Sequence, residues 1–288
     1  MNDRFGLGWR PELAAGILSN LDRIDIVEVI ADDYLDVPRA KRRALKTLAI
    51  QVPVALHGVT LGLASSVAVE TRRLEQMARL VDEIQPEFWS EHLAFVRGGG
   101  IEIGHLAAPP RTEATIDGAA RNLTTAKKMV GAFPLVENIA TLIDPPGSTL
   151  SEADWTCDIL AAAHCALLLD LHNLYANSVN FGFDPYDFIA RIPQEKICVI
   201  HLAGGRWIKA KSTDERRLLD DHLHDVPEAV YDLLEYVGAK RSLPLTVILE
   251  RDGRYPPIEV LLNQLERARA ALGRGRARQQ TSLASEAA

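Results

Sequence analysis

The sequence has few cysteines, no excess of basic residues and no long apolar run, and each scarcity argues against a class of protein. Its three cysteines form no CxxC pair, so a thiolate metal site is not expected, and their odd number fits reduced thiols. The net charge of −7 argues against general nucleic-acid binding, which needs a basic surface. No apolar segment approaches the about 20 residues that span a bilayer. The first residues, MNDRFGLGWRPEL, do not resemble a secretory signal, so we expect a cytoplasmic protein that binds neither nucleic acid nor membrane.

Short apolar segments rich in β-branched residues alternate with amphipathic, helix-like segments such as 69–84 and 112–132. The eight strand candidates are FGLGW, IDIVEVI, VPVALHG, EFWSEHL, FPLVENI, ALLLDLHN, ICVIHLAG and LTVILERD. Nearly continuous apolar strands indicate a parallel sheet covered by helices, and eight β/α units in roughly 250 residues match a closed barrel. We therefore predict a single-domain α/β protein with the (β/α)8 TIM-barrel fold over residues 1–272 and a flexible tail over 273–288. A doubly wound open sheet is the alternative, but FGLGW lacks the complete GxGxxG pattern.

Side chains typical of metal ligands follow most of these strands, at the ends where barrel active sites lie. They are His57, His92, Glu137, Asp170, His201 and Glu250, with Glu91 beside His92 and the segment LLDDHLH (Asp220, Asp221, His222 and His224) before the last strand. Any one of them alone is more often structural, but buried charges are rare unless they are paired or bound to a cation. Imidazoles and carboxylates without sulfur predict iron, manganese or zinc. The candidates outnumber the positions around one octahedral ion, so roughly two or three ions are expected.

The stretch ALLLDLHN ends in three polar residues and leaves open which of them bind. Asp170 is expected to point inward at the mouth of the strand. His172 would also point inward if the strand continued, because side chains alternate with a period of two. A turn at the mouth would favour Asn173 instead.

Several motifs along the chain carry a family resemblance. They are, in order, HGVTLGLAS, SEHLAF, ENIA, LLLDLHNLYANSVNFGFDP, HLAGG, DDH and ERDG. This series resembles the DUF692 family, the multinuclear non-haem iron-dependent oxidases that include the methanobactin-biosynthesis oxidase and the enzyme that acts on cysteine in 3-thiaglutamate assembly. The resemblance runs from GLGWRPEL to about Pro257, nearly the whole chain, and the run from Asp170 to Pro185 is its most distinctive part.

The resemblance implies a TIM barrel that holds iron ions in a mixture of the Fe(II) and Fe(III) states. It assigns one iron to His57, His92 and Glu137, a second to Glu137, Asp170, His201 and Glu250, and a third to Asn173, Asp220 and His222. The ligands of the first two irons are then the expected catalytic residues. The same pattern selects Asn173 over His172, which becomes the alternative ligand.

The resemblance also implies a reaction. Family members bind the thiolate of a cysteine in a ribosomally synthesised precursor peptide to one iron, with O2 at an adjacent iron, and some act on aspartate or asparagine. A small companion protein commonly binds the leader peptide. We therefore expect oxidative modification of a peptide residue, cysteine before the others, with O2 as co-substrate and a companion protein as partner.

Further residues near the strand ends are candidates for contact with the substrate. They are Asn138, Asn177, Trp207, Arg251 and Asp252. Trp207 lies in a basic, aromatic loop that suits an acidic peptide, although such a loop can also be merely solvated. Asn177 can instead bond the backbone of an irregular loop after the sixth strand, and His224 can orient His222.

Three places depart from the family pattern. Asp32 and Asp33 stand where the family usually has a Glu-Asn pair, and Gly205 stands where many relatives carry a histidine. Asp221 stands where a threonine is common, which leaves the outer pair Asp220 and His222 intact. Such changes suggest a different substrate rather than loss of activity.

Three other functions remain open. A zinc nuclease of the endonuclease IV kind would carry histidine at the position of Asn173 and a positive surface; Asn173 and the net charge of −7 both argue against it. A sugar isomerase of the xylose-isomerase kind would use two divalent metals without oxygen. An inactive, peptide-binding barrel would not need the complete set of ligands.

Overall fold

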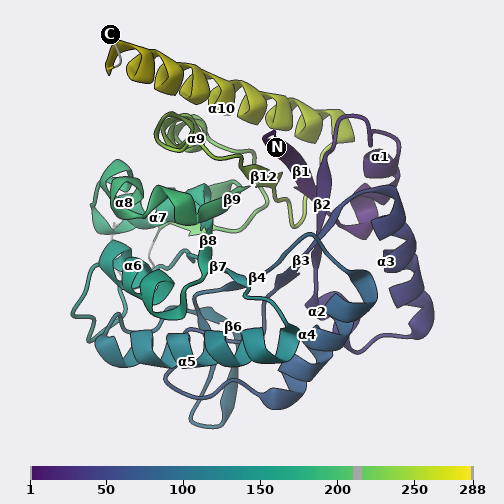
Figure 1. Cartoon of the computed structure of the whole chain (residues 1–288), viewed down its shortest axis with the longest axis vertical. Helices are drawn as coiled ribbons and strands as arrows, with labels where there is room; N and C mark the ends of the chain where they lie inside the picture. Colours follow the sequence, from purple (N-terminus) through teal and green to yellow (C-terminus); the bar gives the residue numbers. More distant parts are fainter. Residues whose placement is uncertain (1, 210–215, 287–288) are drawn as a thin grey trace. The chain divides into compact units, whose positions relative to one another are not determined.

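The structure, a computed structural model, describes residues 2–209 and 216–286. Its barrel strands are β1 (Arg4–Gly8), β2 (Ile26–Ile30), β3 (Val54–Gly58), β4 (Trp89–His92), β7 (Leu135–Glu137), β8 (Ala166–Asp170), β9 (Ile197–Leu202) and β12 (Thr246–Leu249). These eight strands close a barrel in the order β1-β12-β9-β8-β7-β4-β3-β2, and helices alternate with them along the chain (Figure 1). The prediction of eight strands in a TIM barrel is confirmed.

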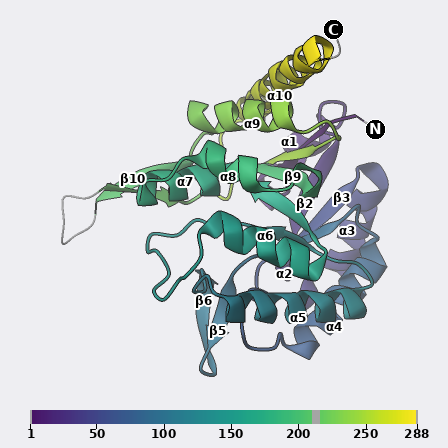
Figure 2. The same ribbon diagram turned by 60° about the vertical axis from the view of Figure 1, so that its left-hand side comes forward.

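One of two compact units comprises Asp25–Ile139 and Ile143–Leu168. Beside its strands it contains α2 (Asp32–Leu35), α3 (Arg39–Gln51), α4 (Thr71–Ile84), α5 (Glu113–Val130), α6 (Glu152–Ala163) and a hairpin of β5 (Phe95–Gly98) and β6 (Ile101–Ala107). The helices expected at 69–84 and 112–132 are α4 and α5. The α5 helix starts where the side chains of Thr112 and Thr115 cap each other's backbone N–H groups. The hairpin, which Figure 2 shows beside α5, has no counterpart in the sequence prediction.

The register within this unit brings ligand candidates to the same level. His57 of β3 is aligned with Ser90 of β4, and His92 of β4 is aligned with Glu137 of β7. Ser90 and His92 lie two residues apart and therefore point to the same side of β4. Three neighbouring strands thus direct four polar side chains to one place.

The other unit comprises Met1–Ile24, Ala140–Leu142 and Leu169–Ala288. Its remaining elements are η1 (Pro11–Leu13), α1 (Ala14–Leu18), α7 (Leu171–Phe181), α8 (Pro185–Arg191), η2 (Gln194–Lys196), β10 (Gly205–Lys209), β11 (Arg216–Asp220), α9 (Glu228–Lys240) and α10 (Ile258–Glu286). The α7 helix begins directly after β8 because the Asp170 side chain caps it, accepting a hydrogen bond of 2.6 Å from the Asn173 N–H. The prediction of an irregular loop after the sixth strand is wrong, since this segment is helical as far as Phe181.

The last helix is longer than the sequence indicated. We expected a helix end near Leu272, but α10 continues to Glu286 beside α9 (Figure 1); residues 287 and 288 of the expected tail lie outside the described residues. A Cβ atom at Gly275 would lie 2.1 Å from the Glu235 carbonyl oxygen, so glycine permits the close approach of the two helices. Arg274 and Arg278 form ion pairs with the Glu235 carboxylate. Among the helices within the described ranges, none is long and apolar enough to cross a membrane.

Candidate metal centre

The first group of candidate ligands consists of His57, His92 and Glu137, all buried, with ligand atoms close enough to hold one ion. The Glu137 Oε2 atom lies 3.3 Å from His57 Nε2 and 3.5 Å from His92 Nε2. The two imidazole rings meet edge to face at 4.6 Å between centroids. Both rings therefore direct the same nitrogen, Nε2, toward one carboxylate.

The other nitrogen of each ring is fixed from behind. His57 Nδ1 lies 2.8 Å from Ser90 Oγ, and His92 Nδ1 lies 3.1 Å from the Gly58 carbonyl oxygen. A carbonyl only accepts, so His92 Nδ1 carries a proton, and in the neutral tautomer that fits this contact Nε2 presents a lone pair. A lone pair that faces the Glu137 carboxylate is unfavourable without a cation between them. Such outer hydrogen bonds, which orient the imidazole, are typical of metal-binding histidines.

Glu91 neighbours His92 but does not join this group. Its side chain is fully buried, Oε1 accepts from the His92 N–H at 2.9 Å, and Oε2 accepts from the Leu61 N–H at 3.1 Å. A Cβ atom at Gly58 would lie 2.8 Å from Glu91 Oε2, so glycine leaves room for the carboxylate. Glu91 is thus an anchor for the backbone around His92 rather than a ligand.

Asp32 anchors the same loop from the other side. It accepts a hydrogen bond of 2.8 Å from the Val59 N–H and another from the Thr60 hydroxyl. Although Asp32 departs from the family pattern, it holds the segment that follows His57.

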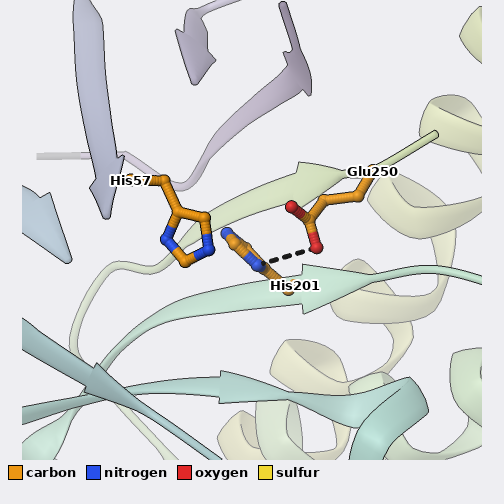
Figure 3. Close-up of side chains that lie close together, drawn as sticks. All are labelled: His57, His201 and Glu250. Atoms are coloured by element: carbon orange, nitrogen blue, oxygen red, sulfur yellow. Dashed lines mark ion pairs between the residues drawn. The ribbon is translucent and has the colours of Figure 1, made fainter. Parts of the chain in front are cut away.

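His201 and Glu250 form a second pair in the other unit. Figure 3 shows the carboxylate facing the imidazole, with Glu250 Oε2 at 3.1 Å from His201 Nδ1. Both side chains are buried, and the Glu250 N–H bonds the Leu202 carbonyl at 2.9 Å. Asp170 is also fully buried, and its Oδ1 atom is used by the α7 cap.

A chain of hydrogen bonds and ion pairs runs through Asp220 and His222. Asp220 Oδ1 lies 2.7 Å from His172 Nδ1, and Asp220 Oδ2 lies 3.0 Å from His222 Nε2. His222 Nδ1 lies 3.2 Å from Asp252 Oδ2, and Asp252 Oδ1 accepts from Arg10 Nε at 3.0 Å. Asp220 and His222 therefore come together as expected, with His172 and Asp252 holding them from either side.

The charges along this series of hydrogen bonds shift the pKa values of Asp220 and His222. Burial would raise the pKa of Asp220, but the His222 charge and the hydrogen bond from His172 hold it well below its usual range. Burial would lower the pKa of His222, but the carboxylates of Asp220 and Glu250 raise it well above its usual value. His222 also has a φ angle of 53°, a left-handed conformation that costs a non-glycine residue about 1–3 kcal/mol and that often marks functional sites.

Comparison with known proteins identifies the family. The family model described as "RiPP precursor modification enzyme MbnB/TglH/ChrH" matches residues 4–273. The chain belongs to the MbnB/TglH/ChrH family. A UPF0276 protein of Caulobacter vibrioides is 32% identical over 275 residues, 95% of this chain and 96% of that protein. A UPF0276 protein of Bordetella bronchiseptica is 34% identical over 276 residues, 94% of this chain and 93% of that protein.

Solved structures share the barrel at low sequence identity. L-ribulose 3-epimerase has a TM-score of 0.60 at 17% identity over 98% of both chains. D-psicose 3-epimerase from Clostridium cellulolyticum H10 has a TM-score of 0.59 at 12% identity, over 96% of this chain and 99% of that one. The IOLI protein, solved with a bound zinc atom, has a TM-score of 0.56 at 12% identity, over 93% of this chain and 96% of that one. These similarities support the fold alone.

In this member of the MbnB/TglH/ChrH family, the sequence left open whether His172 or Asn173 is the metal ligand. The His172 side chain is fully buried and bonded to Asp220, and the Asn173 backbone N–H donates to Asp170 Oδ1. A Cβ atom at Gly205 would lie 2.7 Å from the His172 ring. The His172 ring therefore fills space that a side chain at position 205 would need, which links His172 to the second departure from the family pattern.

The candidates for substrate contact differ in their burial and in their partners. Asn138 is buried directly after Glu137, and Asn177 Oδ1 accepts a hydrogen bond of 2.9 Å from the Thr141 N–H. Arg251 is buried and paired with Asp225. Asp252 contacts His222, as described above, and Trp207 is 46% exposed on β10.

His224 does not contact His222 in the described hydrogen bonds, since its Nδ1 atom lies 2.9 Å from Asp221 Oδ1. Asp252 orients His222 in its place. The sequence analysis also missed the roles of Ser90 and Glu91. Ser90 could have been found from the sequence, because it precedes His92 by two residues and therefore points to the same side of β4.

Proposed function

We propose that this chain uses iron and O2 to oxidise a residue, cysteine before others, in a ribosomally synthesised precursor peptide. Its membership of a RiPP precursor modification family supports a peptide substrate. The observation that carries the proposal is the convergence of His57 Nε2 and His92 Nε2 on Glu137 Oε2, since two imidazole nitrogens and a carboxylate oxygen form a donor set that suits iron.

We further propose that the candidate ligands described above all serve one multinuclear centre. His57, His92 and Glu137 would hold one ion, Glu137 would bridge to a second held by Asp170, His201 and Glu250, and Asn173, Asp220 and His222 would hold a third. The strand ends of a closed barrel meet at one mouth, which supports a shared centre. Bound iron would lower the pKa of a substrate thiol and exchange the electrons that no side chain can supply.

The protein side chains would orient the ligands and hold protons. Ser90 and the Gly58 carbonyl fix the two imidazoles so that Nε2 needs no reorientation on binding. His172 and Asp252 hold Asp220 and His222 in the same way. Metal binding would release the proton that His222 carries, so iron loading of that part should weaken as the pH falls.

Metal content after anaerobic purification tests the proposal. We expect at least two irons per chain by elemental analysis, and zinc alone would refute it. Glu137→Gln should lose iron, because the carboxylate faces both imidazoles of the first group. Glu75→Gln makes the same chemical change at an exposed position of α4 and should keep the wild-type content.

Oxygen dependence tests the reaction itself. A cysteine-bearing precursor peptide from the same gene neighbourhood, with its companion protein, should be modified in air and remain unchanged without O2, as followed by mass spectrometry. Unchanged turnover without O2 would exclude an oxidase. A sugar-isomerase activity, the alternative considered from the sequence, has support from the barrel fold alone.

A further inference from the structure

β10 and β11 form a two-stranded antiparallel ribbon apart from the barrel sheet. β10 starts shortly after His201, and β11 ends at Asp220, where Gly205 and Asp220 are paired. The base of the ribbon therefore lies at candidate ligands, and Figure 2 shows the ribbon running out beside α7.

The ribbon is basic on a chain that carries a net charge of −7. Its basic residues are Arg206, Lys209, Arg216 and Arg217. In the described strands of the ribbon, Asp220 is the sole acidic residue, and it is engaged by His172 and His222. The described strands of the ribbon thus carry a net positive charge.

One face of the ribbon combines these cations with an aromatic surface. Paired residues of antiparallel strands share a face, so the pairs Lys209–Arg216 and Trp207–Leu218 lie on the same side. Trp207 is 46% exposed, and the Arg216 guanidinium lies 5.3 Å from the centroid of its ring. Trp207 and the two cations together offer an exposed aromatic ring beside positive charge, a combination that suits contact with an acidic peptide.

The two edges of the ribbon differ. The Asn180 side chain accepts from the Leu218 N–H at 2.7 Å and donates to the Leu218 carbonyl at 3.0 Å, so it occupies the outer edge of β11. α7 packs along the same strand. Within the described ranges β10 pairs with β11 and with no other strand, which leaves its outer edge open to an added strand.

We propose that the open edge of β10, with Trp207, Lys209 and Arg216, docks an acidic, extended segment of the peptide substrate. This inference rests on the peptide substrate of the proposed function. Strand addition supplies main-chain hydrogen bonds whatever the peptide sequence, and the cations select acidic side chains. A peptide that lies along β10 reaches Gly205, opposite Asp220, and so arrives at the candidate centre.

Fluorescence anisotropy with the full chain tests the docking. The probe is a short fluorescein-labelled peptide of alternating glutamate and valine, and a lysine-valine peptide of equal length is the control probe. We expect the acidic probe to bind, with an affinity that falls as salt rises, and the basic probe not to bind. The double variant Lys209→Glu/Arg216→Glu should bind the acidic probe about tenfold more weakly.

A matched variant controls for net charge. Arg43→Glu/Lys46→Glu makes the same change on exposed positions of α3 and should bind as wild type. Trp207→Ala, a truncation at a half-exposed site, gives a second measurement if the double variant fails to fold. Hydrogen exchange should slow in β10 when the probe binds. Equal binding by both double variants, or protection confined to other elements, would overturn the proposal.

Iron content of the same samples separates this inference from the proposed function. Chain that binds the acidic probe but holds no iron would refute the oxidase proposal and leave the docking surface intact. Iron-loaded chain that ignores the probe would refute the docking surface alone.

Discussion

Replacing Glu91 with glutamine tests whether the buried carboxylate behind His92 prepares the candidate metal group. The change preserves the size of the side chain and removes its charge. Glu91 is fully buried, and its two oxygens accept from the N–H groups of His92 and Leu61. An amide has one acceptor oxygen, so its NH2 group would face one of these two donors.

Two magnitudes follow from this geometry. Losing one bond to a charged acceptor and burying two opposed donors costs about 1–3 kcal/mol of unfolding free energy. For a chain of this size, that lowers Tm by roughly 2–6 °C. Disturbing a group that positions a ligand costs about 10–100-fold in metal affinity. The loss of affinity corresponds to about 1.4–2.7 kcal/mol, similar to the loss of stability, and it is expected because His92 would lose its fixed orientation toward Glu137.

Differential scanning calorimetry and metal titration against a competing chelator measure the two effects, with Glu75→Gln as the exposed control. Gly58→Ala approaches the same carboxylate from the other side, since its Cβ would lie 2.8 Å from Glu91 Oε2. The double variant Gly58→Ala/Glu91→Gln should lose less unfolding free energy than the two single variants together, because both changes disturb one contact. Unchanged affinity in Glu91→Gln with a lowered Tm would refute the link to the metal group, and an unchanged Tm would refute the hydrogen-bond argument.

Three further predictions concern other parts of the chain. His172→Phe removes the hydrogen bond to Asp220 and should lower the unfolding free energy by about 1–3 kcal/mol in urea denaturation; wild-type stability would contradict a role for the bond. Burial raises the pKa of Tyr231 to about 12. The folded chain then keeps a proton that the unfolded chain loses, so stability should fall as the pH rises from about 10 toward 12, and Tyr231→Phe should flatten this slope. Gly275→Ala should lower Tm because its Cβ meets the α9 backbone, whereas Gly273→Ala, with nothing within 4 Å, should not.

The barrel was predictable because its strands are apolar on both faces. β8 illustrates this, since Leu167, Leu168 and Leu169 are all fully buried between the barrel interior and the helices. The β5–β6 hairpin and the β10–β11 ribbon escaped prediction because few of their strand residues are buried, as in β6, where none is. The extension of α10 was missed because Gly273 and Gly275 resemble a helix end, whereas Gly275 in fact permits contact with α9.

The ligand candidates were predictable as a set, because a polar residue at the end of a buried strand is unusual. Which of them are ligands and which have a supporting role was not predictable. Glu91 and His92 are adjacent and equally suited to a metal by residue type, but alternation along β4 places them on opposite sides. The sequence pattern alone could not decide which side faces the barrel interior, whereas the contact of Ser90 with His57 does.

The choice between His172 and Asn173 depends on where the strand becomes a helix. Asp170 uses one oxygen to cap α7, so the chain leaves the two-residue period of the strand at that point and follows the helical one. His172 then lies toward β11, where Gly205 has no side chain and leaves room for the ring beside Asp220. His172 therefore holds the candidate ligand Asp220 through a hydrogen bond, and Gly205, distant in sequence, leaves the space that its ring needs. Neither relation is visible from residue type or spacing, because both depend on the pairing of β10 with β11.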